Sequence, residues 1–226
     1  MVSFRLDGRV ALVTGGNRGL GQACADALAE AGASVIAVGS KELDLATADL
    51  RGYVDGLDRL DILVNNAGII RRTDAVDVTD DDWDDVFTVN VDAAFRLSQA
   101  AGRRMLAQGS GKIINIASML SFQGGVRVPA YTASKHAILG LTKALANEWA
   151  GRGVNVNAIA PGYMATDNTA ALRDDPVRSA AILDRIPAGR WGEPDDLKGA
   201  VVFLASDAAR YVHGTVIPVD GGWLAR

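Results

Sequence analysis

The sequence predicts a doubly wound α/β fold built on a parallel β-sheet. Short Val- and Ile-rich runs recur along the chain, and helical patterns lie between them. Each run is apolar along its whole length, which is typical of strands that helices cover on both faces. This alternation favours parallel strands joined by right-handed crossovers. The predicted strands are Val10–Val13, Val35–Val38, Ile62–Val64, Ile113–Ile116, Val154–Ile159 and Val216–Val219.

The predicted helices lie between these strands, and two of them carry clear boundary signals. Thr79 with Asp82 matches a capping box, and the acidic residues of that turn suit the positive end of the helix dipole. Pro194 suits a first helical turn, where its missing N–H needs no partner. The predicted helices are Gly19–Ala31, Asp80–Ala107, Ala130–Ala150 and Pro194–Ala205.

Composition indicates a globular chain with a single domain over residues 1–226. Hydrophobic residues make up 49% and charged residues 22%, which argues against disorder. The sequence contains no internal repeat and no linker-like shift in composition. Its one cysteine, Cys24, excludes an internal disulfide and a cysteine-rich metal site, and neither histidine has metal-like partner spacing. We therefore expect no metal.

Charge and hydropathy exclude two classes of partner. The formal net charge is −4 and no run is rich in Lys or Arg, so we expect no nucleic acid as partner. The longest uncharged stretches, 113–126 and 153–166, have 14 residues each and are too short to span a bilayer. Residues 1–8 lack a signal-peptide pattern. We expect a cytoplasmic protein that acts on a small molecule, with no membrane partner.

A glycine-rich loop follows the first predicted strand and opens the first predicted helix. Its spacing is G-x-x-x-G-x-G, which lets the backbone turn tightly and lets a pyrophosphate approach the helix N-terminus. A plain strand-to-helix turn is the alternative, but the strand before and the helix after favour a nucleotide site. The loop residues expected to bind the nucleotide are Gly15, Asn17, Arg18, Gly19, Leu20 and Gly21.

This loop resembles that of the short-chain dehydrogenase/reductase family, which reads T-G-x-x-x-G-x-G. Further family elements follow in order: Asn65–Gly68 reads N-N-A-G, Ser118 ends a predicted strand, and Tyr131–Lys135 reads Y-x-x-x-K. The resemblance covers nearly the whole chain and implies a Rossmann domain and an NAD(P)-dependent oxidoreductase. It also implies cofactor contacts from Asn66, Ala67, Gly68, Tyr131, Lys135, Pro161, Gly162 and Thr166.

The resemblance further implies a catalytic set of Asn90, Ser118, Tyr131 and Lys135. Tyr131 would be the general acid/base, Ser118 would hold the substrate oxygen, and Lys135 would bind the nicotinamide ribose. Asn90 would support a water that links Lys135 to solvent. An ordinary tyrosine pKa of about 10 is too high for a base at neutral pH. Because Lys135 shares a helix face with Tyr131, we expect this cation, with the positive nicotinamide, to lower the pKa.

The region that selects the coenzyme departs from the family pattern. NAD-specific folds place an acid after the second strand to hold the ribose 2′-OH, whereas this chain has Ser40 and Lys41 there. We therefore predict a slight preference for NADP(H) over NAD(H), with Glu42 swinging to the ribose as the alternative. Glu42–Leu45 looks like the third strand, so the connection between strands 2 and 3 is shortened. By family analogy, Asp44 and Leu45 would flank the adenine.

The carboxyl half favours an anionic sugar as substrate. Its segments resemble family members that act on deoxy sugar acids, commonly with NAD(H). An arginine can clamp a carboxylate through two parallel hydrogen bonds, and Arg71, Arg72 and Arg127 are candidates. A surface or interface role for these arginines is the alternative. Gln123 and Tyr163 would address sugar hydroxyls.

The family resemblance also assigns a mobile lid and an assembly. Residues 165–186 look like the substrate lid, which would exclude water and complete the pocket. A homotetramer built on the predicted helices 80–107 and 130–150 is expected.

Two other functions stay open. The fold serves many substrates, so a carbonyl reductase of 3-oxoacyl thioesters or other ketones is one alternative. A non-catalytic nucleotide-binding protein is the other, and the intact Ser118, Tyr131 and Lys135 speak against it.

Overall fold

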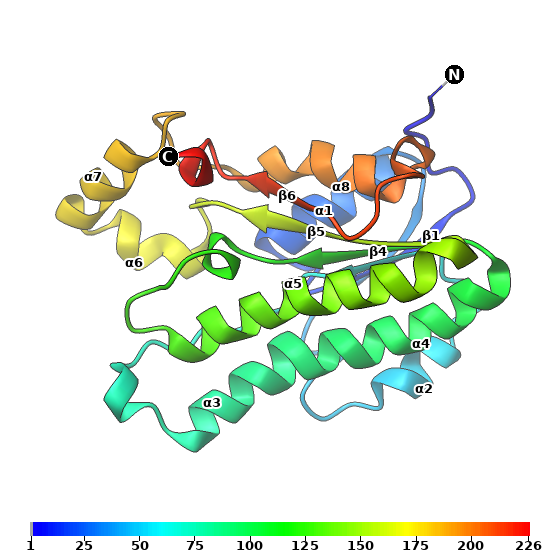
Figure 1. Cartoon of the computed structure of the whole chain (residues 1–226), viewed down its shortest axis with the longest axis horizontal. Helices are drawn as coiled ribbons and strands as arrows, with labels where there is room; N and C mark the ends of the chain where they lie inside the picture. Colours follow the sequence, from blue (N-terminus) through cyan, green and yellow to red (C-terminus); the bar gives the residue numbers. More distant parts are fainter. Residues whose placement is uncertain (1) are drawn as a thin grey trace.

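The computed structural model describes residues 2–226, which form a six-stranded parallel sheet between two layers of helices (Figure 1). The strand order is β2-β1-β3-β4-β5-β6, and each neighbouring pair is parallel. The strands are β1 (Val10–Thr14), β2 (Ser34–Val38), β3 (Ile62–Asn65), β4 (Gly111–Ile116), β5 (Val154–Pro161) and β6 (Val216–Val219). The predicted doubly wound α/β class and all six predicted strands are confirmed.

Helices cover both faces of the sheet and bury an apolar cluster against each face (Figure 1). On one face lie α1 (Gly19–Glu30) and α8 (Lys198–Ala205). On the other lie α2 (Leu50–Asp55), α4 (Ala93–Gln108) and α5 (Pro129–Trp149). Strands β3 and β5 are buried at every residue, which explains why their sequences are apolar throughout rather than alternating. Within residues 2–226, no helix is both long and apolar enough to cross a membrane.

The long helix predicted over residues 80–107 is interrupted. It consists of α3 (Asp80–Phe87), a π-helical turn (Thr88–Asp92) and α4. Thr79 Oγ1 accepts a hydrogen bond from Asp82 N at 3.1 Å, which is one half of the predicted capping box. The π-turn contains Asn90, and such turns occur frequently at functional sites. Apolar periodicity predicts a helix here but does not distinguish its hydrogen-bond pattern.

The segment between β2 and β3 corrects one prediction. Residues 42–45 form a turn, because Glu42 N and Leu43 N both bond back to Gly39 O and the Asp44 carboxylate accepts from Ala46 N. Leu43 is 5% exposed and fills the core from this turn, so its hydrophobicity reflects burial and not strand pairing. The third strand predicted at residues 42–45 was therefore wrong. The short helix α2 follows instead, with the Asp49 side chain accepting from Gly52 N.

The carboxyl ends of the parallel strands meet at one edge of the sheet. The glycine loop follows β1, the N-N-A-G turn follows β3, Ser118 follows β4, and Pro161 ends β5. Ligands of such sheets bind outside this edge. The predicted lid segment, residues 165–186, lies at the same edge and contains a 3-10 turn (Asp167–Thr169), α6 (Ala170–Arg173) and α7 (Pro176–Arg185) (Figure 1).

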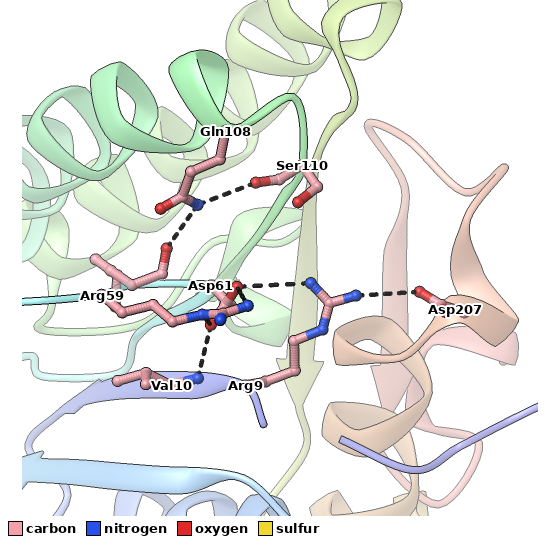
Figure 2. A network of polar contacts seen from close by, with 8 residues as sticks. Arg9, Val10, Arg59, Asp61, Gln108, Ser110 and Asp207 are labelled. Atoms are coloured by element: carbon pink, nitrogen blue, oxygen red, sulfur yellow. Dashed lines mark hydrogen bonds and ion pairs between the residues drawn. The ribbon is translucent and has the colours of Figure 1, made fainter. Parts of the chain in front are cut away.

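The amino-terminal edge of the sheet carries an ion network centred on Asp61 (Figure 2). Asp61 is 3% exposed and accepts hydrogen bonds from Val10 N at 2.8 Å and Arg59 Nε at 2.7 Å. Arg9 lies 3.5 Å from the same carboxylate and 3.9 Å from Asp207. Burial raises the pKa of Asp61, but the hydrogen bonds and cations outweigh it and hold the pKa below its usual value. The network joins the start of β1 to the start of β3.

Candidate active site

The glycine loop and the N-N-A-G turn are in close contact. Thr14 Oγ1 accepts from Asn66 N and Ala67 N, both at 3.1 Å. Asn66 Nδ2 donates to Thr14 O at 2.9 Å and to Gly15 O at 3.1 Å. A Cβ on Gly15 would lie 2.9 Å from Asn66 Nδ2, and Gly15 has a φ of +61°. This close approach explains why glycine is needed at residue 15.

The N-terminus of α1 has the features of a phosphate site. Among residues 2–226 no side chain caps this end, and no acidic residue lies in the first turn. Gly19 has a φ of +53°, and a Cβ on Gly21 would collide with the carbonyl oxygen of Gly15. Free backbone N–H groups and the positive helix end attract a phosphate. The loop residues therefore fit the pyrophosphate of a dinucleotide.

An acidic side chain lies at the end of β2, close to the predicted ribose region. Glu42 Oε2 accepts from Gly39 N and from Asn17 Nδ2, both at 2.9 Å. The Gly39 hydrogen bond is the main cause of the lowered pKa of Glu42. Ser40 and Lys41 are exposed beside it. The turn at residues 39–42 brings this acid back toward the strand end, an alternative the sequence leaves open.

Asp44 and Leu45, predicted to flank the adenine, both make contacts within their own segment. The Asp44 carboxylate accepts from Ala46 N and from Thr47 Oγ1, at 3.0 Å each. Leu45 is partly buried and packs against the core on the side of α2.

Tyr131 and Lys135 lie together on α5, as the sequence predicts. Lys135 Nζ is 5.6 Å from the centre of the Tyr131 ring and donates to Ile116 O at 2.7 Å. Lys135 is 4% exposed, and burial lowers its pKa to about 8. Within residues 2–226, no carboxylate forms an ion pair with this ammonium.

The pKa of Tyr131 differs from the sequence-based expectation. Desolvation by its surroundings raises this pKa, and a hydrogen bond with the Ser118 side chain and the charge of Arg72 oppose the rise only in part. For the protein's own groups the pKa of Tyr131 is therefore raised, against the expected lowering, because the desolvation of the phenol outweighs the Ser118 hydrogen bond and the charge of Arg72. A phenol with a raised pKa keeps its proton at neutral pH and can donate a hydrogen bond.

The loop that carries Ser118 is held against α5. Ser118 Oγ accepts from Leu120 N at 3.1 Å, and Ser121 Oγ accepts from Ser118 N at 3.2 Å. Ser121 Oγ also donates to the backbone carbonyl of Lys135 at 2.7 Å. These bonds fix Ser118 relative to the helix of Tyr131.

Asn90 links the N-N-A-G turn to α5. Its Oδ1 accepts from Ile69 N at 2.8 Å, and its Nδ2 donates to Ile69 O at 3.0 Å and to Ser134 Oγ at 3.1 Å. A Cβ on Gly68 would lie 3.2 Å from Asn90 Oδ1 and 3.7 Å from Lys135 Nζ. Since both ends of the amide are engaged, any water-holding role would fall to the backbone of the π-turn.

Two of the arginines predicted to bind substrate make ion pairs with acids of this chain. Arg71 lies 3.2 Å from Asp82 and 3.0 Å from Asp85. Arg127 lies 2.9 Å from Asp74 and has a φ of +63°. Their charges are thus balanced at the surface.

Of these three arginines, Arg72 is the one whose charge acts on Tyr131. Its Nη2 donates to the Asn168 carbonyl at 3.1 Å, and its charge acts on the pKa of Tyr131. Within residues 2–226 it has no carboxylate partner. The two adjacent arginines have different partners, because Arg71 pairs with acids of α3 and Arg72 bonds to the backbone of residues 167–169.

Gln123 and Tyr163 belong to an aromatic wall near the lid. Gln123 Oε1 accepts from Trp223 Nε1 at 3.0 Å. The ring of Tyr163 packs edge-on against Trp191 and Trp223, with centroids 5.5 Å and 4.8 Å apart. The three rings pack in one apolar cluster with the buried Met119, which directly follows Ser118 in the chain.

The segment after β5 returns toward the glycine loop. A Cβ on Gly162, which follows Pro161, would lie 2.5 Å from Asp220 Cα. The methyl carbon of Thr166 is the nearest atom to a Cβ built on Gly19, at 3.9 Å. The predicted cofactor residues at 162 and 166 thus border the strand ends and the glycine loop.

The start of the predicted lid also contacts the glycine loop. Arg18 Nη1 lies 3.6 Å from a carboxylate oxygen of Asp167, and both side chains are exposed. This ion pair links the N-terminus of α1 to the 3-10 turn at residues 167–169.

Comparison with known proteins places these features in a family. The pattern described as "short chain dehydrogenase" matches residues 9–51, and that described as "Enoyl-(Acyl carrier protein) reductase" matches residues 46–224. The 2-dehydro-3-deoxy-D-gluconate 5-dehydrogenase of Escherichia coli (strain K12) is 56% identical over 99% of this chain and 98% of its own length. That alignment spans 251 positions, more than the 226 residues of this chain, so the relative has residues that this chain lacks.

Solved structures indicate the same family. A protein from Agrobacterium tumefaciens with bound NADP has a TM-score of 0.91 and 55% identity over 99% of both chains. A gluconate 5-dehydrogenase from Burkholderia cenocepacia, in complex with NADP and tartrate, has a TM-score of 0.94 and 40% identity over 99% of this chain and 98% of the other. With its motifs meeting at one sheet edge and such likeness along its whole length, this chain belongs to the short-chain dehydrogenase/reductase family.

Proposed function

We propose that the protein is an NAD(P)-dependent oxidoreductase that interconverts a hydroxyl and a keto group of a deoxy sugar acid. The observation that carries the proposal is the cluster of Ser118, Tyr131 and Lys135 beside a glycine loop suited to a pyrophosphate. The substrate class is supported by the name of the E. coli relative and by the tartrate, a hydroxy acid, in the B. cenocepacia complex.

The chain's own residues would perform the proton transfer. A bound nicotinamide supplies or accepts the hydride. The Tyr131 hydroxyl would give its proton to the substrate oxygen during reduction and take it back during oxidation. Ser118 Oγ would hold the same oxygen, since the Ser118 side chain is close enough to act on the pKa of Tyr131. The Lys135 ammonium, 5.6 Å from the ring, would stabilise the phenolate that forms and hold the ribose.

We assign recognition of the substrate carboxylate to Arg72. It is near Tyr131, whereas Arg71 and Arg127 are neutralised by Asp82, Asp85 and Asp74. A guanidinium held by one backbone carbonyl keeps donors for a carboxylate, and the planar fork matches two oxygens. Residues 165–186 would close over the bound acid as a lid and exclude water. The whole chain would act as one domain.

For the coenzyme we propose use of both forms with a slight preference for NADP(H). The exposed Arg18, Ser40 and Lys41 can meet a 2′-phosphate, and both structural relatives described above contain NADP. The Glu42 carboxylate at the end of β2 opposes that phosphate and suits a ribose hydroxyl, which keeps the preference small. Separate titrations with NADH and NADPH test this order.

We also propose a cytoplasmic homotetramer that contacts through α3, α4 and α5. Phe95 on α4 is 39% exposed, and an apolar ring at a helix surface suits an interface. The single, buried Cys24 suits a reducing compartment. Light scattering after gel filtration measures the assembly.

A reductase for 3-oxoacyl thioesters is the second candidate, because the family pattern that matches residues 46–224 is named for an acyl-carrier-protein reductase. A panel of ketones, followed by nicotinamide absorbance, separates the two. We expect 2-dehydro-3-deoxy-D-gluconate or a related keto acid to turn over, with a kcat/KM at least tenfold above an acetoacetyl thioester. A higher value for the thioester would favour the second candidate. Tight coenzyme binding without any turnover would indicate a nucleotide-binding protein.

A further inference from the structure

A tryptophan near the C-terminus contacts two segments that the proposed reaction needs. Trp223 is 6% exposed and begins a 3-10 turn (Trp223–Ala225). Its Nε1 donates to Gln123 Oε1 at 3.0 Å, and Gln123 N in turn bonds to Met119 O in the loop that carries Ser118. One edge of the indole is thus bound to the catalytic loop.

This tryptophan also contacts the predicted lid. The guanidinium carbon of Arg185, on α7, lies 4.1 Å from the centre of the Trp223 ring. Ile182 and Ile186 are buried in the same apolar cluster as Trp223 and Met119. The tail adds a hydrogen bond from Arg226 Nη1 to the Asp184 carbonyl, at 2.9 Å. The C-terminal segment and α7 therefore pack as one unit.

The position of the indole is itself fixed by its own turn. The Asp220 carboxylate accepts from Gly222 N and from Leu224 N, at 2.9 Å each. Gly221 and Gly222 have φ values of +64° and +89°, which side chains disfavour. Since this turn begins directly after β6, the tryptophan is tied to the sheet.

The two halves of the predicted lid are held differently. The first half, residues 167–173, bonds to the exposed Arg72 through the Asn168 carbonyl and to the exposed Arg18 through Asp167. Within it, Thr169 bonds to backbone carbonyls of its own segment, and Leu172 is partly buried against the cluster that contains Trp223. The second half, α7, is held by buried apolar packing and by Trp223. Exposed polar contacts exchange readily with water or with a ligand, whereas buried packing does not.

We propose that Trp223 is a positioning residue that fixes α7 relative to the loop of Ser118, so that the lid opens through residues 167–173 alone. The proposal rests on the proposed function for the part that concerns substrate. Because α7 is anchored, the aromatic wall of Tyr163, Trp191 and Trp223 stays in place. Residues 167–173 of the lid move when a substrate carboxylate binds Arg72 and replaces its hydrogen bond to the Asn168 carbonyl.

The test compares Trp223→Phe with the parent. Phenylalanine keeps a ring against Arg185 and Tyr163 but removes the indole N–H that binds Gln123. We expect KM for the keto acid to rise about fivefold to twentyfold, the factor for loss of one buried hydrogen bond. We expect kcat to change less than about twofold and coenzyme affinity to stay the same, because the proton-transfer groups are untouched.

A second readout does not depend on any substrate. Trypsin cleaves after Arg178 and Arg185 of α7, and we expect this cleavage to be at least about fivefold faster in the variant because α7 is released more often. Trp83→Phe is the matched control, since Trp83 is an exposed tryptophan of α3 stacked on Phe87. It should leave both KM and cleavage at the parent values.

Gln123→Leu removes the same hydrogen bond from the other side and covers the case in which Trp223→Phe does not fold. It should reproduce both effects, and the double variant should be no worse than either single variant. Parent-like cleavage and KM in the folded variants would overturn the proposal. If α7 is cleaved faster in the variants but the parent turns over no sugar acid, the anchoring role of Trp223 is supported and only the proposed function is refuted.

Discussion

The two edges of the sheet differ in whether their buried charges have an oppositely charged partner. At the amino-terminal edge, the buried Asp61 is surrounded by Arg9, Arg59 and the backbone N–H of Val10 (Figure 2). At the carboxyl edge, Lys135 and Arg72 have no carboxylate partner within residues 2–226. A neutralised network stabilises the fold, whereas an unbalanced cation in a desolvated site is available to a negative charge that forms or arrives there.

Among the charged groups of the two edges, the largest effect should come from removing the buried ammonium. In Lys135→Met we expect kcat/KM to fall about 10²–10³-fold, within the range of positioned acid–base groups, with thermal stability near that of the parent. Steady-state kinetics and a thermal melt measure the two effects. Lys143→Met is the control, because Lys143 lies exposed on the same helix. A comparable loss in the control would show that any charge on α5 matters and would remove the special role of Lys135.

The pH dependence of the parent sharpens this prediction. Since burial lowers the pKa of Lys135 to about 8, its ammonium group loses its proton and its positive charge as pH rises through that value. The kcat/KM for ketone reduction should therefore fall above about pH 8, and Lys135→Arg should move the fall to higher pH. A profile that is flat to pH 10 would contradict the assignment.

The next largest effect lies at the opposite edge. Asp61→Ala leaves Val10 N without its partner and separates two arginines from their shared acid, so we expect about 2–3 kcal/mol lower unfolding free energy. Both arginines are partly exposed and regain water, which limits the loss. Denaturant melts measure it, and kcat per folded molecule should stay within twofold.

The sign of the pH effect at Asp61 follows from its lowered pKa. Its contribution to stability is present above the unfolded-state pKa and is lost as pH falls through the folded-state value. The stability gap between the parent and Asp61→Asn should therefore narrow between pH 5 and pH 2. A gap that stays constant over this range would mean that the carboxylate charge is not what stabilises the edge.

A smaller effect should separate two adjacent arginines. Arg72→Ala should raise KM for a carboxylated ketone about 10- to 30-fold, the loss expected for charge-assisted hydrogen bonds, and change KM for a neutral ketone less than threefold. Arg71→Ala should leave both KM values near the parent, because Arg71 is paired with Asp82 and Asp85. Equal effects of Arg72→Ala on both ketones would exclude the carboxylate clamp.

The smallest effect concerns the coenzyme. Glu42→Gln removes the negative charge beside the predicted 2′-phosphate position, so the ratio of kcat/KM for NADPH to that for NADH should rise about three- to tenfold. Asp44→Asn is the control, because Asp44 bonds within its own turn. An unchanged ratio in Glu42→Gln would place the phosphate elsewhere.

Strand positions could be predicted from the sequence because buried parallel strands leave a continuous apolar signature. The same signature led to the wrong strand at residues 42–45, where Leu43 is buried from a turn and the relatives have a longer chain. Hydrophobicity reports burial, and only hydrogen bonding distinguishes a strand from a turn.

The chemistry of the site was predictable where it depends on local spacing. Tyr131 and Lys135 share a helix face because they are four residues apart, and the structure places them as expected. Side chains that depend on long-range contacts were not predictable. Gln123 bonds to a tryptophan 100 residues away, and the partner of Arg127 is an acid from another loop.

The most direct test of the central claim is Tyr131→Phe, assayed for turnover and for coenzyme binding in the same preparation. If the Tyr131 hydroxyl at the carboxyl edge of the sheet transfers the proton, kcat should fall at least about 1,000-fold while the Kd for NADPH stays within threefold. Turnover equal to that of the parent would contradict the account.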